Sequence, residues 1–412
     1  MEVGIWQIRI ALRGCLQYGA PVPETQTMSN TRLQPHQIQV GKPLAFDAYD
    51  AYGKLLLRRG VVIDSQHQLD ALLERGLFRD MGQQWDTVVV DPGPGSTPRP
   101  VARKVSVFEL VLEVQQRLDA LLTGAPVPDF SAQVHHLAAQ LQRGFKLDCD
   151  AVLATIQVMH EGRYAMRRMV HSAILIELLM AQAGGNEAQR RVVMCSALTM
   201  NVAMLDLQDE LFHQAEPPSA PQRARVQEHS TQGVAMLREL GVSDESWLRF
   251  VAQHHETIDG KGSPRGLVGA QICRAGQLLS LADRYGAMAT GRGYRPAALP
   301  NVVLKQIFMD KDKGVDASLA SLLVKAVGIY PPGSLVELAN GDVAVVVKRT
   351  QSASQPVVRC VRTYRKEILE QPRKRLTSEP AYAITRLIAI ADLGFALNPA
   401  LLWDEGFEVE SL

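Results

Sequence analysis

The sequence predicts a mainly α-helical protein, with a small α+β module before the helices and a short β-rich extension after them. Three observations support this fold class. Apolar residues recur at helical spacing from about residue 104 to 330. A hairpin pattern, LAFDAYDAYGKLLLRRG, precedes the helical region, and a second one, SLVELANGDVAVVVKR, follows it. The helical region is by far the longest of the three, so it is expected to carry the main core.

The N-terminal part divides into three predicted segments. Residues 1–35 are expected to be disordered or to precede the true start at Met28, and the arginines inside their apolar run argue against a secretory peptide. Residues 36–90 form the α+β module, with strands on either side of Tyr52-Gly53, a helix at 65–78 and a strand at 85–90. Residues 91–103 are rich in Pro, Gly and Ser, which is typical of a linker.

The helical domain is predicted to span residues 104–330, with eight or more helices. One of them is expected to run without a break through RVVMCSALTMNVAML, at 191–205. Residues 331–370 form the β extension, in which Asn340-Gly341 favours a type I′ turn. The tail, 371–412, shows a weak helical pattern from about residue 380.

Bulk properties exclude several classes of protein. The 412 residues are 46% hydrophobic and 21% charged, with a net charge of +1, which gives no reason to expect DNA or membrane binding. No apolar stretch approaches the roughly 20 residues that span a bilayer. The odd number of cysteines and the absence of a CxxC pair indicate reduced thiols in a cytoplasmic protein. The cysteines are Cys15, Cys149, Cys195, Cys273 and Cys360.

Several polar residues in the helical domain could bind a metal. His254-His255-Glu256 ends an amphipathic helix and precedes a Gly- and Pro-rich loop, TIDGKGSPRGL. His171, His229 and Asp283 lie in apolar helical stretches, where a polar side chain needs a partner. Neutral imidazoles suit Fe, Mn, Ni or Zn when several converge. Any one of these residues alone is more often a satisfied core residue or a solvated helix end.

Taken in order, these residues resemble the HD-GYP family, whose members are metal-dependent cyclic di-GMP phosphodiesterases. The similarity lies in HHETIDGKGSPRGL at 254–267, LADRYGAMATGRGYRPAAL at 281–299 and YPPGSLVELANGDVAVVV at 330–347. It covers most of residues 36–365. The resemblance implies that the predicted helical domain has the HD-type fold and that the protein takes part in bacterial cyclic di-GMP signalling.

The sequence departs from the family pattern at the HD dyad and the Gly-Lys pair that follows it. The four positions read Met200, Asn201, Ala203 and Met204. The Tyr of the GYP motif is Ser263, and the second Asp of the later helix is Gly286. The family's dyad Asp bridges two metals, and its Lys lies near the phosphate. The resemblance therefore implies a degenerate active site, and no residue is assigned a catalytic role.

The resemblance implies one surviving metal site. Its ligands are His229, His254 and His255, and a three-histidine site with open positions is chemically reasonable. The other site keeps His171 and Asp283 but loses its dyad, and Asn201 is a further candidate ligand. The expected cofactor is one divalent transition metal, Fe, Mn, Ni or Zn, or none if the site is fully degenerate. Phosphate oxygens would be held by Lys261, Arg265, Arg292 and Arg295, although solvated surface charge explains each of these equally well.

Three hypotheses follow for function. The first is a degenerate HD-GYP protein that binds a cyclic dinucleotide or a diguanylate cyclase (GGDEF) domain, with little or no hydrolysis. The second is an active phosphodiesterase with a reduced metal site, so enzyme activity is left uncertain. The third is a metal-free scaffold. A homodimer is also considered. The MNVAM segment discriminates between the first two, since apolar filling by Met200 and Met204 favours binding and an Asn201 that reaches the metal favours catalysis.

Overall fold

The computed structural model describes residues 103–311, 314–403 and 407–409, and within the first 102 residues only 30–32, 48–49, 55–57, 61, 63 and 78–80. The chain divides into two compact units, Met1–Pro98 and Arg99–Leu412. Each unit is described by itself. Of the described helices, none is long and apolar enough to cross a membrane.

The N-terminal unit contains a four-stranded antiparallel sheet in the order β1-β4-β2-β3. Its strands are β1 (Asn30–Arg32), β2 (Ala48–Tyr49), β3 (Leu55–Leu57) and β4 (Phe78–Asp80). The β2–β3 pair confirms the hairpin predicted around Tyr52-Gly53. Strand β1 falls inside the segment 1–35 that was expected to be disordered, and it pairs with β4.

Other expectations for this unit lie outside the described residues. They are the helix at 65–78, apart from Phe78, which begins β4, and the strand at 85–90. The linker at 91–103 also lies outside them, apart from its last residue, Arg103, which begins β5.

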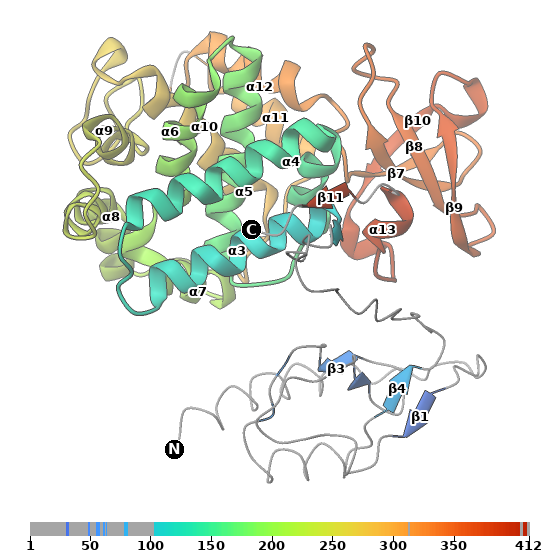
Figure 1. Ribbon diagram of the computed structural model, residues 1–412. Coiled ribbons are helices and arrows are strands. Elements are labelled where there is room, and N and C mark those ends of the chain that lie inside the picture. The colour runs from blue at the N-terminus through green and yellow to red at the C-terminus, as the bar shows by residue number, and fades with distance from the viewer. Residues whose placement is uncertain are drawn as a thin grey trace. The chain divides into compact units, whose positions relative to one another are not determined.

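The second unit is mainly helical, as the sequence predicts (Figure 1). Eight or more helices were expected here from the 3.6-residue period, and the described part of this unit has ten between residues 107 and 327. They are α3 (Val107–Thr123), α4 (Phe130–Val158), α5 (Tyr164–Gln182), α6 (Glu187–Thr199), α7 (Leu205–His213), α8 (Ala220–Glu239), α9 (Glu245–Gln253), α10 (Arg274–Ala289), α11 (Pro300–Met309) and α12 (Ala317–Val327).

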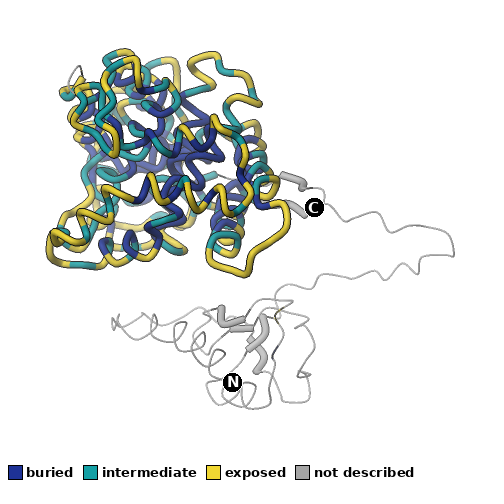
Figure 2. The backbone as a smooth tube through the Cα atoms, turned by 90° about the vertical axis from the view of Figure 1, so that its left-hand side faces the viewer, coloured by how far each residue is buried: buried dark blue, intermediate teal, exposed yellow. Residues whose placement is uncertain are grey.

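Helix α5 lies at the centre of this helical domain. Every residue from Tyr164 to Leu179 is buried, and α3, α4, α6, α7, α10 and α12 pack around the helix. In Figure 2 the buried segments gather in the interior of the domain. A helix that is buried on all sides must satisfy its polar side chains inside the protein. Arg168 and His171 of α5 are therefore inside the core, 3% and 4% exposed.

The helix expected at 191–205 is interrupted. Helix α6 ends at Thr199, and a 3₁₀ helix, η2 (Val202–Met204), precedes α7. At Asn201 the backbone leaves helical geometry, with φ −106° and ψ 16°. Apolar residues continue on both sides of this break, so the hydrophobic period could not reveal it. The break lies at the positions aligned with the family's dyad.

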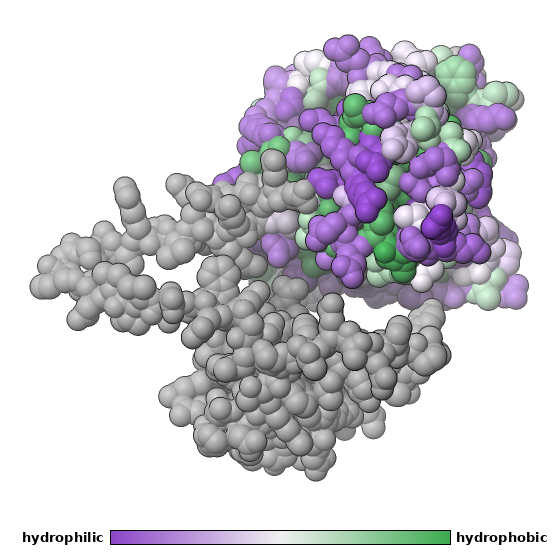
Figure 3. All heavy atoms as spheres, turned by 90° about the vertical axis from the view of Figure 1, so that its right-hand side faces the viewer, coloured by the Kyte–Doolittle hydropathy of each residue, from purple (hydrophilic) through white to green (hydrophobic). Residues whose placement is uncertain are grey.

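The C-terminal extension is a five-stranded antiparallel sheet in the order β10-β6-β7-β8-β9. Its strands are β6 (Leu335–Leu338), β7 (Val343–Lys348), β8 (Val357–Arg362), β9 (Ile368–Leu376) and β10 (Ile384–Ile388). The boundary expected at residue 370 falls inside β9, an edge strand with few buried side chains and hence little apolar alternation. Figure 3 views the molecule from the side of this sheet, where hydrophilic side chains predominate.

The turn between β6 and β7 differs from the expected type I′. That type needs positive φ at both central residues, and Gly341 (φ 85°) has it whereas Asn340 does not. The amide of Gly341 donates to Leu338 O, which fits a three-residue loop with a left-handed glycine. The amide of Asn340 donates instead to Ala381 O, in the segment before β10, and this contact favours the longer loop.

The residues after β10 return to the helical domain. They contain a short helix, α13 (Pro399–Leu402), and β11 (Phe407–Val409), which pairs with β5 (Arg103–Val105). Trp403 donates its ring N–H to Val347 O of β7 at 3.1 Å, and its ring centroid lies 5.1 Å from that of Phe108 on α3. The side chain therefore joins the sheet to the first helix of the domain.

Candidate metal centre

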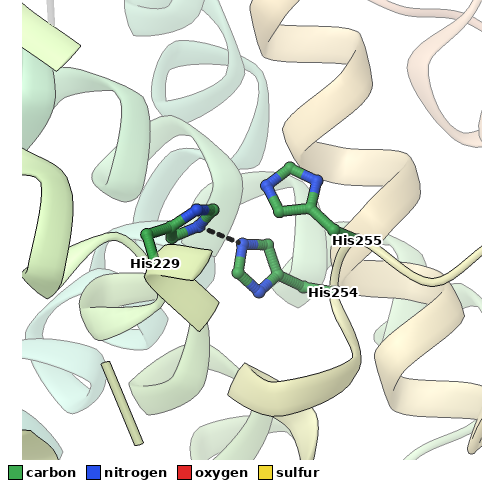
Figure 4. A group of neighbouring side chains, drawn as sticks. All are labelled: His229, His254 and His255. Atoms are coloured by element: carbon green, nitrogen blue, oxygen red, sulfur yellow. Dashed lines mark hydrogen bonds between the residues drawn. The ribbon is translucent and has the colours of Figure 1, made fainter. Parts of the chain in front are cut away.

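Three histidines converge between α8 and the end of α9. His229 comes from α8, and His254 and His255 directly follow the last residue of α9. One ring nitrogen of each lies within 4.8 Å of the others, and Figure 4 shows the three rings turned toward a common point. We call these residues the histidine trio. Within the described part of the chain, no other group of His, Cys, Asp or Glu has this geometry.

Local interactions fix the end of α9 that carries two members of the trio. Asp244 caps the helix, because its carboxylate accepts from the amides of Ser246 (2.8 Å) and Trp247 (3.1 Å). Trp247 is fully buried and donates its ring N–H to Thr199 Oγ1 of α6 at 2.8 Å. Helix α9 is therefore anchored to α6 about two turns before His254.

The hydrogen bonds of the trio define its tautomers. His229 Nδ1 lies 2.5 Å from Val226 O, and His254 Nδ1 lies 2.6 Å from Val251 O. A carbonyl oxygen only accepts, so each Nδ1 carries the proton, and each Nε2 of a neutral ring then presents a lone pair. The two Nε2 atoms lie 3.1 Å apart, at the dashed line in Figure 4. Two facing lone pairs need a cation, and a Nδ1–H bound to a carbonyl is the usual arrangement of a metal-binding histidine.

The electrostatics keep the trio neutral. Burial, followed by the neighbouring His255, lowers the pKa of His254 to about 3, although Asp283 works against this shift. Burial also lowers the pKa of His229 and of His255 to about 4. All three rings are therefore unprotonated at neutral pH, which is the form that binds a metal.

Asp283, a further candidate ligand, is paired with a residue that the sequence analysis did not single out. Arg168 of α5 donates through Nη2 to the carboxylate of Asp283 on α10, and to its backbone oxygen at 3.0 Å. Burial alone would raise the pKa of Asp283, but Arg168, then His255 and His254, lower it to about 2. The only available signal was the position of this arginine in an apolar stretch, one helical turn before His171.

His171 does not join the trio. It is buried on α5, and within the part of the chain that is described its Nε2 has no hydrogen-bond partner. Burial, then Arg167 and Arg168, lowers its pKa to about 3. The charges nearest to His171 are thus arginines, which oppose a metal ion at this position.

The positions aligned with the HD dyad and with the lysine that follows it are occupied as follows. Met200 is fully buried in the main core. Met204 packs against Leu207, Leu211 and Val226 in a small apolar cluster. Asn201 is 1% exposed, and its Nδ2 lacks a partner among the described residues. Two of the three side chains thus supply apolar volume, and the third faces the site with an unused donor.

A small cavity of about 80 Å³ adjoins the trio. We call it the site cavity. Six polar residues, each from a different segment of the helical domain, line it together with Met204 and two other apolar side chains. The polar residues are Arg168, Asn201, Gln208, His255, Asp283 and Arg292.

One of the four basic residues proposed for phosphate binding reaches the cavity. Arg292 lines it and donates from Nη1 to the hydroxyl of Tyr294 at 2.7 Å. Lys261 is 85% exposed, and its Nζ lies 3.7 Å from Asp259. Arg265 and Arg295 are also exposed and do not line the cavity, and Arg295 donates to Ala287 O.

Glu256, which follows the two histidines, holds the Gly- and Pro-rich loop. It is 2% exposed and accepts from the amides of Arg265 (2.8 Å) and Leu267 (2.9 Å). The loop also passes very close to the backbone of the histidines. A Cβ on Gly262 would lie 2.4 Å from Thr257 N and 2.5 Å from His255 O. Glycine is therefore required at this position, and the loop conformation is coupled to the position of His255.

Comparison with known proteins gives a family match in this region. The family model described as HD domain matches residues 151–319, which include the trio, Asn201 and Asp283. The chain is similar to a cyclic di-GMP phosphodiesterase of Pseudomonas aeruginosa, with 25% identity over 203 residues that make up 48% of each protein. It is also similar to a 3'3'-cGAMP-specific phosphodiesterase of Vibrio cholerae, with 22% identity over 50% of this chain and 51% of that protein.

The chain spans about half the length of these curated relatives. Among solved structures, an HD-GYP-type protein from Bdellovibrio bacteriovorus matches with a TM-score of 0.49 and 14% identity, over 72% of this chain and 98% of that one.

Proposed function

We propose that this chain, an HD-GYP-type protein of the HD superfamily, acts in cyclic dinucleotide signalling by binding its ligand, with little or no hydrolysis. The ligand class comes from the relatives, whose names describe phosphodiesterases for cyclic di-GMP and 3'3'-cGAMP. The binding role comes from the site residues of this chain.

The single observation that carries the proposal is the pairing of Arg168 with Asp283. A carboxylate that accepts from a buried guanidinium is already neutralised and offers less to a metal ion. The aligned dyad contributes Met200 and Asn201, a buried thioether and a neutral amide, which are poor ligands for a hard divalent ion. A pair of metals that would clamp both the attacking and the leaving oxygen is therefore not supported by these side chains.

One metal fits the histidine trio. His229, His254 and His255 would hold a divalent transition metal, Fe, Mn, Ni or Zn, because their rings are neutral and two lone pairs face each other. Such an ion would act as a Lewis acid toward a phosphate oxygen. The carbonyl oxygens of Val226 and Val251 orient the rings of His229 and His254.

Specific observations bear on each of the two alternative functions. An active phosphodiesterase with a reduced metal site is favoured by the site cavity, which places Asn201 and Asp283 beside His255. A metal-free scaffold is disfavoured by the 3.1 Å contact between two unprotonated Nε2 atoms. Met200 and Met204, which fill space with apolar volume, favour binding over catalysis.

Three measurements on one preparation test the proposal. Metal content is measured by mass spectrometry, cyclic di-GMP binding by calorimetry, and hydrolysis by chromatography of the nucleotide products. We expect about one transition metal per chain, measurable binding and no turnover above background. The His254→Ala variant should lose the metal, whereas His136→Ala, an exposed position on α4, should keep it. Turnover in wild type that is absent in His254→Ala would favour the enzyme, and no nucleotide binding would reject the proposal.

We also propose four further properties that were expected from the sequence. They are a diguanylate cyclase (GGDEF) domain as a partner, a homodimer, a cytoplasmic location and a regulatory role for the module at 36–90. Co-purification with a GGDEF domain and sedimentation velocity test the first two. Deletion of residues 1–98, the first compact unit, tests whether that module changes ligand binding.

A further inference from the structure

The site cavity collects hydrogen-bond donors that lack acceptors. Four buried nitrogen atoms from three lining residues have no partner among the described residues. They are Nε and Nη1 of Arg168, Nδ2 of Asn201 and Nε of Arg292. Buried polar groups are almost always paired, so several unpaired donors around one cavity indicate a missing acceptor.

The charges around the cavity favour an anion. Arg168 and Arg292 contribute two positive charges, and Asp283 is the single carboxylate in the lining. Its negative charge is taken up by Arg168. The one unpaired acceptor in the lining is Oε1 of Gln208, and a flip of this amide would present its NH₂ group instead. The three apolar lining residues are Met204, Leu211 and Val226.

We propose that the site cavity is a phosphoryl-binding subsite in which Arg168 and Arg292, together with the Asn201 amide, receive the oxygens of one phosphate group. The inference rests on the proposed function, since it names the part of the cyclic dinucleotide that enters the cavity. Guanidinium groups suit this role because their planar donors match phosphate oxygens. The positive charge beside Asp283 is then the guanidinium of Arg168, on α5.

The size of the cavity limits what enters it. A cavity of about 80 Å³ is smaller than the roughly 150 Å³ cavity that accepts benzene. A phosphate group fits such a space, whereas a purine base does not. The bases of the ligand therefore stay outside, and the subsite recognises a phosphate common to cyclic di-GMP, related dinucleotides and inorganic phosphate.

Gly286 offers a direct way to test the role of Arg168. A Cβ built on this buried helical glycine lies 3.7 Å from Arg168 Nη1 and 3.9 Å from its Cζ, which is ordinary contact. Alanine is therefore accommodated without a clash. Aspartate at the same position would place a carboxylate against the unpaired nitrogen and compete with a bound anion. Gly286→Ala and Gly286→Asp thus form a matched pair that differs by one charged group.

The experiment uses the full chain treated with chelator, so that no metal contributes to anion binding. Binding of inorganic phosphate is measured by calorimetry for wild type, Gly286→Ala and Gly286→Asp, after circular dichroism confirms that each is folded. We expect wild type and Gly286→Ala to bind alike and Gly286→Asp to bind at least about tenfold more weakly. Asn201→Asp, a nearly isosteric change that adds a negative charge in the lining, should also weaken phosphate binding.

The outcomes separate this inference from the proposed function. Absence of phosphate binding to chelated wild type, or equal binding by the two Gly286 variants, would overturn the subsite. Cyclic di-GMP is titrated in parallel. Phosphate binding with the expected variant pattern but no cyclic di-GMP binding supports the subsite and rejects the proposed ligand. Cyclic di-GMP binding that is equal in both Gly286 variants supports the proposed function and rejects the subsite.

Discussion

The Nε2 atoms of His229 and His254 lie 3.1 Å apart, and each faces the other with a lone pair. Because both Nδ1 atoms donate to carbonyl oxygens, neither ring can donate across this contact without gaining a proton. Burial opposes that proton, since it lowers the pKa of both rings to about 4 or below. A metal ion bound by both Nε2 atoms would remove the repulsion between their lone pairs at neutral pH.

The first prediction concerns metal removal. Chelator should lower the melting temperature of wild type and have no effect on His254→Ala, because only the folded trio binds the ion. At a free metal concentration about 100 times Kd, the bound ion stabilises the fold by about 2.7 kcal/mol. Differential scanning fluorimetry with and without chelator measures the difference. His136→Ala serves as the control and should respond like wild type, and an equal response of His254→Ala would refute the site.

The second prediction concerns pH. In the chelated protein, the free energy of unfolding should fall as pH is lowered from about 6.5 to 4. In this window the unfolded chain protonates these histidines, whereas the folded chain, with pKa values of about 4 for His229 and His255 and about 3 for His254, does not. Within this window each histidine lowers the free energy of unfolding by up to about 1.4 kcal/mol for each unit that the pH falls. Above pH 6.5 these histidines are unprotonated in both states, so the full stability is present.

Urea unfolding at a series of pH values measures this slope. The His254→Ala variant removes one of the titrating groups, so its stability should depend less steeply on pH. His136→Ala, which removes an exposed histidine outside the trio, is the matched control variant. Identical slopes in wild type and His254→Ala would contradict the neutral, buried state of this ring.

The trio could be anticipated from the sequence because its residues belong to a recognisable motif. His254 and His255 precede a Gly- and Pro-rich loop, and His229 lies in an apolar helical stretch before them. Arg168 could not be assigned, because a cation in a helix is ordinarily placed on its solvent side. Only the position of α5 at the centre of the domain makes this arginine buried and turns it toward Asp283.

The details of the backbone were harder to predict than the elements. The break at Asn201 lies within an apolar run, and hydrophobic period alone does not register a change from α to 3₁₀ geometry. The β6–β7 turn depends on contacts from residues 381–383, more than 40 residues away, which no local pattern contains. Strand β9 lies at the sheet edge with most side chains exposed, so its sequence lacks the alternation of a half-buried strand.

The third prediction concerns the loop that follows the trio. Gly262→Ala should distort this loop, because the added Cβ would lie 2.4–2.5 Å from Thr257 N, Glu256 Cα and His255 O. Since these are backbone atoms next to a metal-binding residue, metal affinity should fall about tenfold or more, within the range seen when groups supporting a ligand are lost. Competition with a fluorescent chelator measures the affinity. Gly286→Ala, where the nearest atom is 3.7 Å away, is the control and should bind metal like wild type.

The fourth prediction concerns the buried ion pair. Arg168→Met should destabilise the fold by about 3–5 kcal/mol, because it leaves the carboxylate of Asp283 buried without its partner. The double variant Arg168→Met/Asp283→Asn removes both charges and should recover much of this loss. Chemical denaturation of the single and double variants gives the coupling energy. If the double variant were as unstable as the sum of the singles, the two side chains would be energetically independent, and the cation opposite Asp283 would have to come from elsewhere.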